Sequence, residues 1–522
     1  MLRLISLAAL LFVTAGCRAR ELAQPSPGDP ADGSAPSAEQ RAAVPPTHRP
    51  IPPPPPATSS NATLWVALAD HLGVAPQASP LDVVSAGAPL QLRDASGRRW
   101  SASSAQVRWS VVPLPPYELA RRVAGPFASF ESADRVAQRW RAMGVEALVA
   151  HPGEWEVWAP ADALVPEGLT VRSWSTVVTQ AVRPVLELAD GGHSIEGTLV
   201  IEAPDGLRWG RGVYRGPFRL QPDAYGSWTL VEQVPLERYL EGVVPHEIGA
   251  SAPEAALQAQ TVLARTWALA NSHRFVIDGY HLCSDTQCQV YSDPRIAGVS
   301  VRQAIAATAG QVLSWQGAPI SAVYHASNGG VMASGPEAWS MAAVPYLAAR
   351  PDGDAAWMQR HPLPLNDAAA VQRLLQDRQG AHGATHPRFR WTRSYGSAEI
   401  LQALGDEGQQ LQVPLQLRVV ERGVSGRVLA LEIAGAGDAA PVVLSLDRIR
   451  RTLRRLPSTL FVLQAAEAGR WGFQGGGFGH GAGLSQAGAI QLAYWGWGTQ
   501  RILSHYYPGA IYGPLNAPVH DP

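Results

Sequence analysis

The chain has 522 residues and a formal charge of −1, with 42 basic residues against 43 acidic ones. This length predicts more than one domain and enough apolar material for a large core. The near-neutral balance gives no electrostatic basis for binding nucleic acid or for strong attraction to an anionic surface. Every basic residue is arginine, so a catalytic or Schiff-base lysine is excluded.

Residues 1–17 have the pattern of an export signal. Arg3 is the charged start, residues 4–13 form the apolar run, and Thr14-Ala15-Gly16-Cys17 follows. The apolar run is too short to span a bilayer as a stable helix. Small residues directly before a cysteine resemble a bacterial lipobox, in which Cys17 is lipidated, although Thr14 stands where leucine is usual. A plain secretory signal is the alternative, and in both cases the protein leaves the cytoplasm. With the lipid, it becomes a membrane-anchored lipoprotein of the cell envelope, facing the periplasm or the outer surface.

Residues 18–61 are rich in Pro, Ala, Ser and Gly and include the run Pro52–Pro56. A segment of this composition cannot bury a core, so we expect a disordered, locally extended tether. Short apolar alternations then predict a strand-rich region over residues 62–195. Within it, residues 111–160 predict strands around one helix and weakly resemble half of a SPOR domain, a fold associated with bare peptidoglycan glycan. An ordinary βαβ piece of the same domain is the alternative.

Residues 196–515 predict a second domain in which strands and helices come in blocks. Strand signals precede residue 234, two helices follow within residues 234–271, and a third is expected over residues 300–308. Residues 413–446 are mostly strands, and a last helix is expected near residues 485–494. This order favours an α+β fold, with a mixed strand-rich domain around a helical catalytic segment, over a doubly wound sheet.

Glu247 lies in a short polar break between the two apolar helical patterns of residues 234–271. We expect Ser251 to cap the second helix, with Pro253 in its first turn. A carboxylate on such a rigid elbow, beside apolar walls that raise its pKa, has the properties of a general acid. A solvated loop glutamate is the alternative.

Cys283 and Cys288 form a close pair in the run CSDTQCQVYSDP. In an exported protein they predict a small disulfide loop, which the loop-entropy relation values at roughly 2 kcal/mol. The alternative is a zinc site completed by histidines, with His281 and His273 as the nearby candidates.

Two further runs contain polar side chains next to glycines. YHASNGGVMASGPEAW places His325, Ser327 and Asn328 before Gly329-Gly330, where the backbone can approach a ligand closely. It contains no nucleophile elbow, so hydrogen bonding to sugar hydroxyls is the better use of these side chains than a triad, and a hairpin turn is the alternative. GGGFGHGAGLSQAGA places His480 between two glycines and has no lysine, which argues against a phosphate loop. We expect His480 in a cleft, and a purely structural loop is the alternative.

Eight runs occur in an order that resembles the stage II sporulation protein D / LytB amidase-enhancer (SpoIID/LytB) family. The resemblance is firm over about residues 196–512 and looser back to residue 64. The runs are VPLERYLEGVVPHEI, AQTVLARTWALAN, CSDTQCQVY, SNGG, PYL, LPSTLF, GFGHGAGLSQAGA and ILSHYYPGA.

The resemblance implies a SpoIID-like fold and a lytic transglycosylase that cleaves the MurNAc–GlcNAc bond of peptidoglycan glycan strands, preferably stripped of stem peptides. It makes Glu247 the catalytic residue, acting first as acid and then as base while the MurNAc 6-hydroxyl closes a 1,6-anhydro ring. No cofactor is then required. The substrate-binding residues that it implies are Ser327, Asn328, Gly329, His480, Ser485, Gln486 and Arg265.

The family's zinc-binding members carry a histidine just before the second cysteine, where this chain has Gln287. That departure weakens the prediction of a structural zinc ion bound by Cys283, Cys288 and His281. The family also has an enhancer branch, so the alternative function is a non-catalytic amidase enhancer or glycan-binding lipoprotein. Expected partners are glycan strands, an N-acetylmuramoyl-L-alanine amidase in the enhancer case, and the membrane through the lipid anchor.

Overall fold

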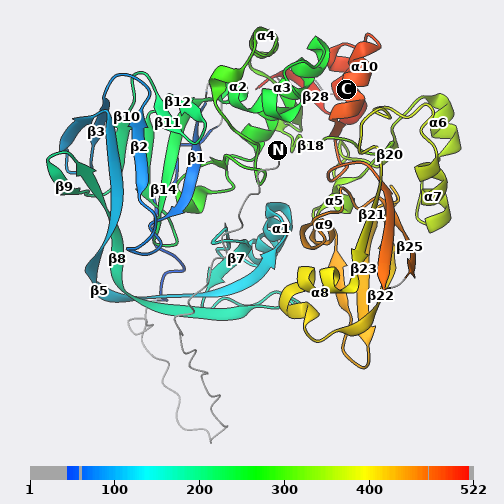
Figure 1. The fold of residues 1–522 in the computed structure, drawn as a ribbon, viewed down its shortest axis with the longest axis horizontal. Coiled ribbons are helices and arrows are strands. Elements are labelled where there is room, and N and C mark those ends of the chain that lie inside the picture. Colours follow the sequence, from blue (N-terminus) through cyan, green and yellow to red (C-terminus); the bar gives the residue numbers. More distant parts are fainter. Residues whose placement is uncertain (1–43, 58–61, 468, 516–522) are drawn as a thin grey trace, which may run out of the picture. The chain divides into compact units, whose positions relative to one another are not determined.

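The computed structural model describes residues 44–57, 62–467 and 469–515. It is a mixed α+β structure, as the order of strand and helix signals predicted (Figure 1). Cys17 and most of the predicted tether lie outside the described residues. No helix of the described ranges has the length and apolar character needed to cross a bilayer.

A seven-stranded sheet joins strands from distant parts of the sequence. β1 lies between β14, to which it is antiparallel, and β15, to which it is parallel. In sheet order the strands are β15 (Leu282–Cys283), β1 (Thr63–Leu72), β14 (Trp228–Pro235), β13 (Phe218–Pro222), β10 (Leu199–Glu202), β3 (Leu90–Arg93) and β4 (Arg99–Ala102).

This sheet crosses the predicted domain boundary at residues 195/196. β1 and β3 come from the expected N-terminal region, whereas β14, β13 and β10 come from the expected second domain. The structure therefore places both regions in one core rather than in two domains. The alternating patterns identified the strands, but sequence spacing does not show which strands pair across more than 100 residues.

A second sheet is organised around two long strands, β5 (Ser104–Phe127) and β8 (Arg172–Leu188), which pair along most of their length. The remaining strands are β12 (Gly212–Tyr214), β11 (Leu207–Trp209), β2 (Leu81–Ser85), β7 (Trp155–Pro160), β6 (Leu148–Ala150) and β9 (Gly191–Ser194). The end of β5 continues into α1 (Phe130–Arg141), β6 and β7, which agrees with the strands around one helix predicted for residues 111–160. The side chain that caps α1 is Ser129.

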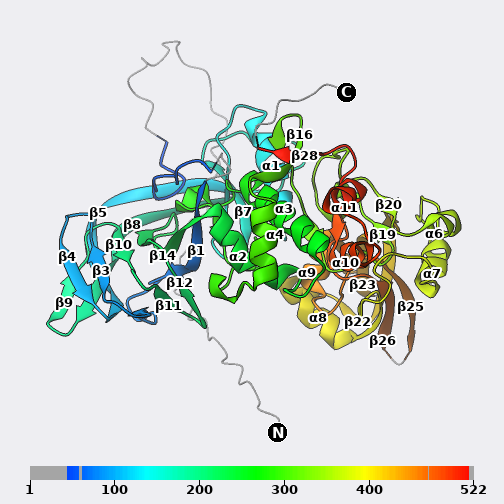
Figure 2. The ribbon, with the colours of Figure 1, turned by 90° about the horizontal axis from the view of Figure 1, so that it is seen from above.

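Helices α2 (Leu236–Glu247), α3 (Glu254–Ala270) and α4 (Val299–Ala307) pack together beside the seven-stranded sheet (Figure 2). α3 is rich in Ala and Leu and is buried on almost every side, so it forms the centre of the largest apolar cluster. The expectation that Ser251 caps α3 is wrong: Pro253 occupies the cap position and no side chain caps the helix. Proline suits a helix start because its missing N–H would be unpaired there anyway.

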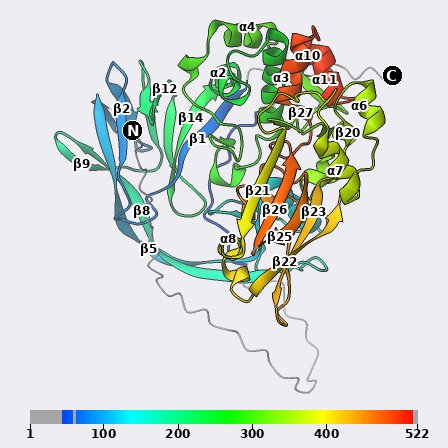
Figure 3. The ribbon, with the colours of Figure 1, turned by 45° about the vertical axis from the view of Figure 1, so that its right-hand side comes forward.

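The C-terminal third contains smaller sheets and short helices. β21, β26 and β25 lie side by side, and β22, β23 and β24 form a second three-stranded sheet (Figure 3). Both sheets bury their apolar faces in a separate core with α8 and α9. The strands are β16 (Gln311–Trp315), β17 (Ala318–Pro319), β18 (Tyr324–His325), β19 (Val331–Met332), β20 (Arg350–Pro351), β21 (Arg390–Gly396), β22 (Gln412–Arg422), β23 (Val428–Ala436), β24 (Val442–Ser445), β25 (Phe461–Glu467), β26 (Arg470–Gly476), β27 (Leu484–Ser485) and β28 (Ile511–Pro514). The helices are α5 (Gly335–Ala338), α6 (Ala355–Arg360), α7 (Ala368–Gln376), α8 (Ser397–Leu404), α9 (Asp447–Thr452), α10 (Gln486–Tyr494) and α11 (Thr499–Tyr506).

Residues 44–57 differ from the prediction of a disordered tether. Ala120 N–H donates to Pro46 O at 3.2 Å, and Arg121 donates to Thr47 O at 2.8 Å. His281 Nε2 lies 2.8 Å from Pro55 O. Ala57 is buried in the main apolar core and Ile51 packs against a smaller cluster. Composition alone missed this segment because much of its attachment uses backbone carbonyls, which every residue carries.

Candidate active site

Glu247 is the last residue of α2, at the point where the helix ends. The buried side of α2 consists of apolar and aromatic residues that fix the helix against α3 and the sheet. The chain then turns through Gly249, whose φ of +85° suits glycine. The Glu247 side chain is half-buried, so the solvated loop glutamate considered from the sequence is not what the structure contains.

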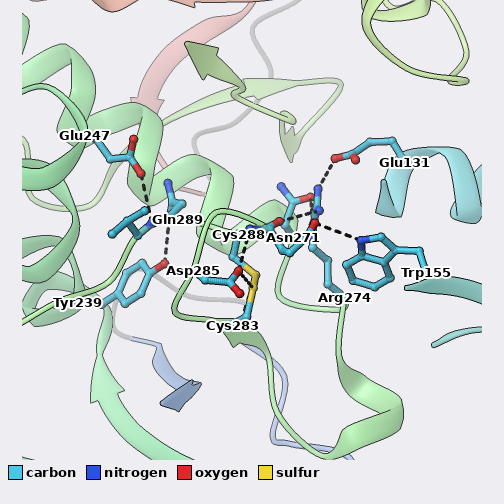
Figure 4. The surroundings of a disulfide bond; sticks show 12 residues. Glu131, Trp155, Tyr239, Glu247, Asn271, Arg274, Cys283, Asp285, Cys288 and Gln289 are labelled. Atoms are coloured by element: carbon cyan, nitrogen blue, oxygen red, sulfur yellow. Dashed lines mark hydrogen bonds and ion pairs between the residues drawn. A yellow bond between two sulfur atoms is a disulfide. The ribbon is translucent and has the colours of Figure 1, made fainter. Parts of the chain in front are cut away.

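A chain of hydrogen bonds orients the Glu247 carboxylate. Val290 N–H donates to its Oε1 at 3.3 Å, and the Tyr324 hydroxyl donates to it as well. Tyr324 Oη accepts from Gln289 Nε2 at 2.9 Å. Gln289 Oε1 in turn accepts from Tyr239 Oη at 3.1 Å (Figure 4). Because the Tyr324 oxygen accepts the hydrogen bond from Gln289, the phenolic proton of Tyr324 is available for donation to Glu247.

The environment of Glu247 raises the pKa of its carboxyl group. Burial is the largest cause, and the hydrogen bonds from Val290 and Tyr324 oppose it. Loss of hydration disfavours the charged form of a carboxyl group, so more of it stays protonated near neutral pH. Such a group can give a proton to a leaving oxygen and take one back afterwards.

Glu247 lines a cavity of about 820 Å³. We call it the Glu247 cavity. α1, the cysteine loop, α9 and the start of β21 all contribute to its lining, and α9 contacts the cysteine loop through Arg451 and Gln287. The residues that line it include Phe130, Glu131, Glu247, Arg274, Gln287, Gln289, Val290, Tyr324, Trp339, Arg388, Arg393, Asp447, Arg450, Arg451, Arg454, Arg455, Phe478 and His480.

His480 lines the Glu247 cavity as the glycine-rich run predicted. Its Nε2–H donates to Tyr324 O at 2.8 Å, and its Nδ1 accepts from Ala482 N–H at 3.2 Å. Burial, followed by the nearby positive charge of Arg450, lowers the pKa of His480 to about 3. The imidazole is therefore neutral and holds the backbone of Tyr324 rather than serving as an acid.

The flanking glycines of His480 are required by close packing. Gly479 has φ +114°, and a Cβ there would meet the His325 Cβ at 2.6 Å; Gly481 has φ +87° and lies against Arg427. These are positions where only glycine avoids both strain and collision. The Trp339 ring lies 4.6 Å from the His480 ring between centroids, which gives the cavity an aromatic face.

Cys283 and Cys288 form a disulfide. Cys283 is the last residue of β15, which pairs with β1, so the bond ties Cys288, and Gln289 and Val290 directly after it, to the edge of the sheet. His281 Nδ1 accepts from Trp65 N–H at 2.9 Å, and its Nε2 faces Pro55 O. With both sulfurs bonded and both imidazole nitrogens engaged by backbone, this arrangement does not fit a zinc site of Cys283, Cys288 and His281.

Ser327, Asn328 and Gly329 lie behind the Glu247 cavity rather than on its surface. Ser327 pairs through its backbone with Phe478, at 3.1 and 2.7 Å. Asn328 is fully buried; its Nδ2 donates to Asp352 at 2.6 Å. The run thus supports the glycine-rich loop from beneath.

Ser485, Gln486 and Arg265 also have structural contacts. Ser485 caps α10 by accepting from Gly488 N–H at 3.3 Å, and Gln486 Nε2 donates to Gln260 at 3.3 Å. Arg265 forms two hydrogen bonds with Glu237, both at 2.7 Å. Of the predicted set, the structure places Glu247 and His480 on the cavity surface and the others in its supporting layers.

Sequence reasoning missed the groups that complete the Glu247 cavity. The sequence pattern places Tyr324 and Tyr239 among apolar positions and Gln289 in the cysteine run, so it does not predict their hydrogen bonds. The spacing of tyrosines on apolar elements signals burial but not the direction of the hydroxyl. The signal that was available is the arginine-rich run DRIRRTLRRLP at residues 447–457, several residues of which line the cavity.

Comparisons with known proteins agree with the motifs. Residues 224–315 match the family model "Stage II sporulation protein", and residues 333–483 match a domain of unknown function. The chain is 26% identical over 286 residues to the amidase enhancer of Bacillus subtilis, covering 52% of this chain and 39% of that protein. It is 27% identical over 302 residues to stage II sporulation protein D of Bacillus amyloliquefaciens, covering 53% and 74%. An uncharacterized protein from Brachyspira hyodysenteriae is 26% identical over 340 residues, covering 64% and 81%.

The match to the Bacillus subtilis amidase enhancer therefore spans about two fifths of that relative's length. The class that the fold and the motifs define is an α+β protein with a SpoIID-type segment at its centre. These comparisons confirm the resemblance that the eight motifs indicated, and they support assignment of the chain to the SpoIID/LytB family.

Proposed function

We propose that the protein is a peptidoglycan lytic transglycosylase that uses Glu247 as its catalytic residue. The observation that carries the proposal is a half-buried carboxyl group with a raised pKa, held by Val290 N–H and the Tyr324 hydroxyl in a cavity of about 820 Å³. A cavity of this size takes a short stretch of glycan, and its combination of aromatic and polar surface suits sugars.

Glu247 acts first as an acid. Its proton passes to the oxygen that joins MurNAc to GlcNAc, and that C–O bond breaks as positive charge develops on the MurNAc ring. The carboxylate then accepts the proton of the MurNAc 6-hydroxyl, whose oxygen closes the 1,6-anhydro ring. Because the substrate supplies the nucleophile, the second carboxylate of an ordinary glycosidase is not needed.

The hydrogen-bond chain from Tyr239 through Gln289 to Tyr324 serves both steps. In the acid step it fixes the carboxyl group in one rotamer. In the base step the Tyr324 hydroxyl stabilises the carboxylate that has just lost its proton. A positioned acid–base group of this kind contributes about 10²–10⁴-fold to the rate.

The test is digestion of purified stem-free glycan, with mass spectrometry of the products. The wild-type chain is expected to yield 1,6-anhydro-MurNAc ends, and Glu247→Gln to lose about 10²-fold or more of that activity because glutamine has no transferable proton. Glu118→Gln, an exposed position on β5, is the matched control and should retain full activity. Equal absence of anhydro ends from wild type and Glu247→Gln would refute the proposal.

A second candidate function is stimulation of an amidase. The amidase enhancer of Bacillus subtilis is among the relatives, which supports this reading. Here the chain binds glycan and raises the activity of an N-acetylmuramoyl-L-alanine amidase without cleaving the strand. Stimulation that persists undiminished in Glu247→Gln, together with no anhydro product from wild type, would favour the enhancer.

We further propose a place at the cell wall, with export by residues 1–17 and lipidation of Cys17. The support is the small residues Thr14-Ala15-Gly16 before the cysteine. Fractionation with metabolic labelling by a fatty acid tests it: label should appear in the wild-type chain and be lost in Cys17→Ala.

A further inference from the structure

One side of the Glu247 cavity is strongly basic. Seven arginines and three carboxylates line the cavity, whereas the chain as a whole carries slightly more acids than bases. Arg274 is ion-paired with Glu131 on the α1 side. The other six come from β21, α9 and the adjoining segments, and we call them the arginine wall: Arg388, Arg393, Arg450, Arg451, Arg454 and Arg455.

Most of this charge is not neutralised by the protein. Among the described residues, Arg455 is the one wall arginine within ion-pair distance of a carboxylate, 3.0 Å from Glu399. Arg451 donates to the neutral amide of Gln287 at 2.7 Å, and Arg454 to a backbone carbonyl at 3.3 Å. Arg388 lies 4.0 Å from the Phe478 ring centroid. Like charges held this close repel one another, so the wall weakens the fold unless an anion occupies it.

One buried donor at the wall points the same way. Within the described part of the chain, Arg450 Nε is buried and has no hydrogen-bond partner. Buried polar groups are normally paired, so an unpaired donor lining a cavity indicates an acceptor that completes it. Arg450 also lies near His480, which holds the backbone of Tyr324.

We propose that the arginine wall binds carboxylate groups carried by the glycan strand and so sets the position of the scissile bond at Glu247. The planar fork of arginine matches a carboxylate in two parallel hydrogen bonds. The cavity lining also offers neutral and aromatic surface from Tyr324, Trp339 and His480. A chain of neutral sugars that carries a carboxylate at regular intervals matches both kinds of surface.

This inference rests on the proposed function, because it takes a glycan as the occupant of the Glu247 cavity. The carboxylates have two sources on the same polymer. One is the lactyl group of MurNAc in a strand without stem peptides, and the other is the stem peptides themselves. Both present the same group to the wall.

The experiment measures binding in the absence of turnover. The full chain with Glu247→Gln is titrated by calorimetry with stem-free glycan, with the same glycan after its lactyl carboxylates are converted to methylamides, and with glycan that retains stem peptides. The wall variant adds Arg388→Gln and Arg454→Gln. Its matched control adds Arg211→Gln and Arg373→Gln, which are exposed outside the cavity. Melting curves of all three proteins check that each is folded.

The wall variant is expected to bind charged glycan about tenfold more weakly, which is the size expected for two partly exposed arginine–carboxylate contacts. The control should bind as the parent does. Methylamide glycan should bind the parent and the wall variant equally, because the group that the arginines recognise is gone. If the wall substitutions weaken binding of the stem-free strand alone, the lactyl group is the source of the carboxylate. If they weaken binding of the stem-bearing strand alone, the stem peptide is the source.

Equal affinity of the parent for charged and methylamide glycan, with no loss for the stem-bearing strand in the wall variant, would overturn the proposal. Competition by inorganic polyphosphate at the same concentration as glycan would also overturn it, since the wall would then be a non-selective anion surface. The proposed function fails separately: wall-dependent binding without 1,6-anhydro product from the wild type would refute catalysis and leave the carboxylate site standing.

Discussion

At the scale of the residue, the position of Glu247 follows from opposing effects on one carboxyl group. Burial at the end of α2 raises its pKa, while the donors Val290 and Tyr324 lower it. The balance leaves a group that both gives and takes a proton. Of the two donors, Tyr324 is the one that mutation can test directly, because its side chain can be replaced without altering the backbone.

Tyr324→Phe removes the hydroxyl that stabilises the ionised form of Glu247. The pKa of Glu247 should therefore rise further, and the alkaline limb of the pH–rate profile should move to higher pH. Loss of the orienting contact should lower kcat by about tenfold. The profile of anhydro-product formation from pH 4 to 9 measures both effects.

Tyr117→Phe on β5 is the control for Tyr324→Phe and should leave the profile unchanged. An alkaline limb that moved to lower pH in Tyr324→Phe would contradict the direction given for the hydrogen bond, and an unchanged limb would show that Tyr324 does not act on Glu247.

At the scale of the element, the disulfide loop links the seven-stranded sheet to the residues that orient Glu247. Cys283 ends β15, which pairs with β1, and Gln289 and Val290 follow directly after the loop. The cysteine pair was predicted from the sequence with two alternatives; in this structure the two sulfurs are bonded to each other and His281 contacts backbone groups of Trp65 and Pro55. No spacing rule reveals that His281 meets the carbonyl group of Pro55.

The double substitution Cys283→Ser/Cys288→Ser should lower the free energy of unfolding by about 2 kcal/mol, because the unfolded chain regains the entropy of a short loop. It should also lower transglycosylase activity, since Val290 and Gln289 hold the acid. Chemical denaturation and the glycan digest measure the two effects.

A thiol reductant should reproduce the loss of stability in the wild type and leave the double variant unaffected. Two free thiols in the unreduced wild type, together with one bound zinc per chain by elemental analysis, would contradict the disulfide.

The same scale shows what sequence patterns can and cannot give. α3 and α4 were located well because apolar periodicity is a strong local signal. No helix was predicted at α6, α7 or α8, although α7 has nine residues like α4 and α10, which were predicted. Ser327 and Asn328 were assigned to the site because polar side chains beside glycines resemble ligand contacts, and their burial comes from partners more than 20 residues away.

At the scale of the whole molecule, the N-terminal strands are integral to the fold that carries Glu247. β1 separates β14 from β15, and β3 pairs with β10. Their loss would leave the apolar faces and ladder edges of β14 and β10 open to water and to other chains.

A fragment of residues 196–515, the domain expected from the sequence, should therefore aggregate or lack a cooperative melting transition. A fragment of residues 44–515 should melt cooperatively and retain glycan cleavage. Circular dichroism with temperature, with size-exclusion chromatography, distinguishes them. A cooperative transition of the shorter fragment at the same Tm would show that residues 44–195 are dispensable.

The attachment of residues 44–57 has a mechanical consequence. A force that arrives from the N-terminal side must first detach this segment from its hydrogen bonds to Ala120, Arg121, Ala224 and His281 and from the apolar core that buries Ala57. Only then does the force reach β1, which is bonded along both edges and resists sliding as a unit. Detachment of residues 44–57 would lengthen the chain before tension acts on β1, the strand that pairs with β15 at the start of the disulfide loop. Residues 44–57 thus protect the fold that carries Glu247 from a force applied at the N-terminal side.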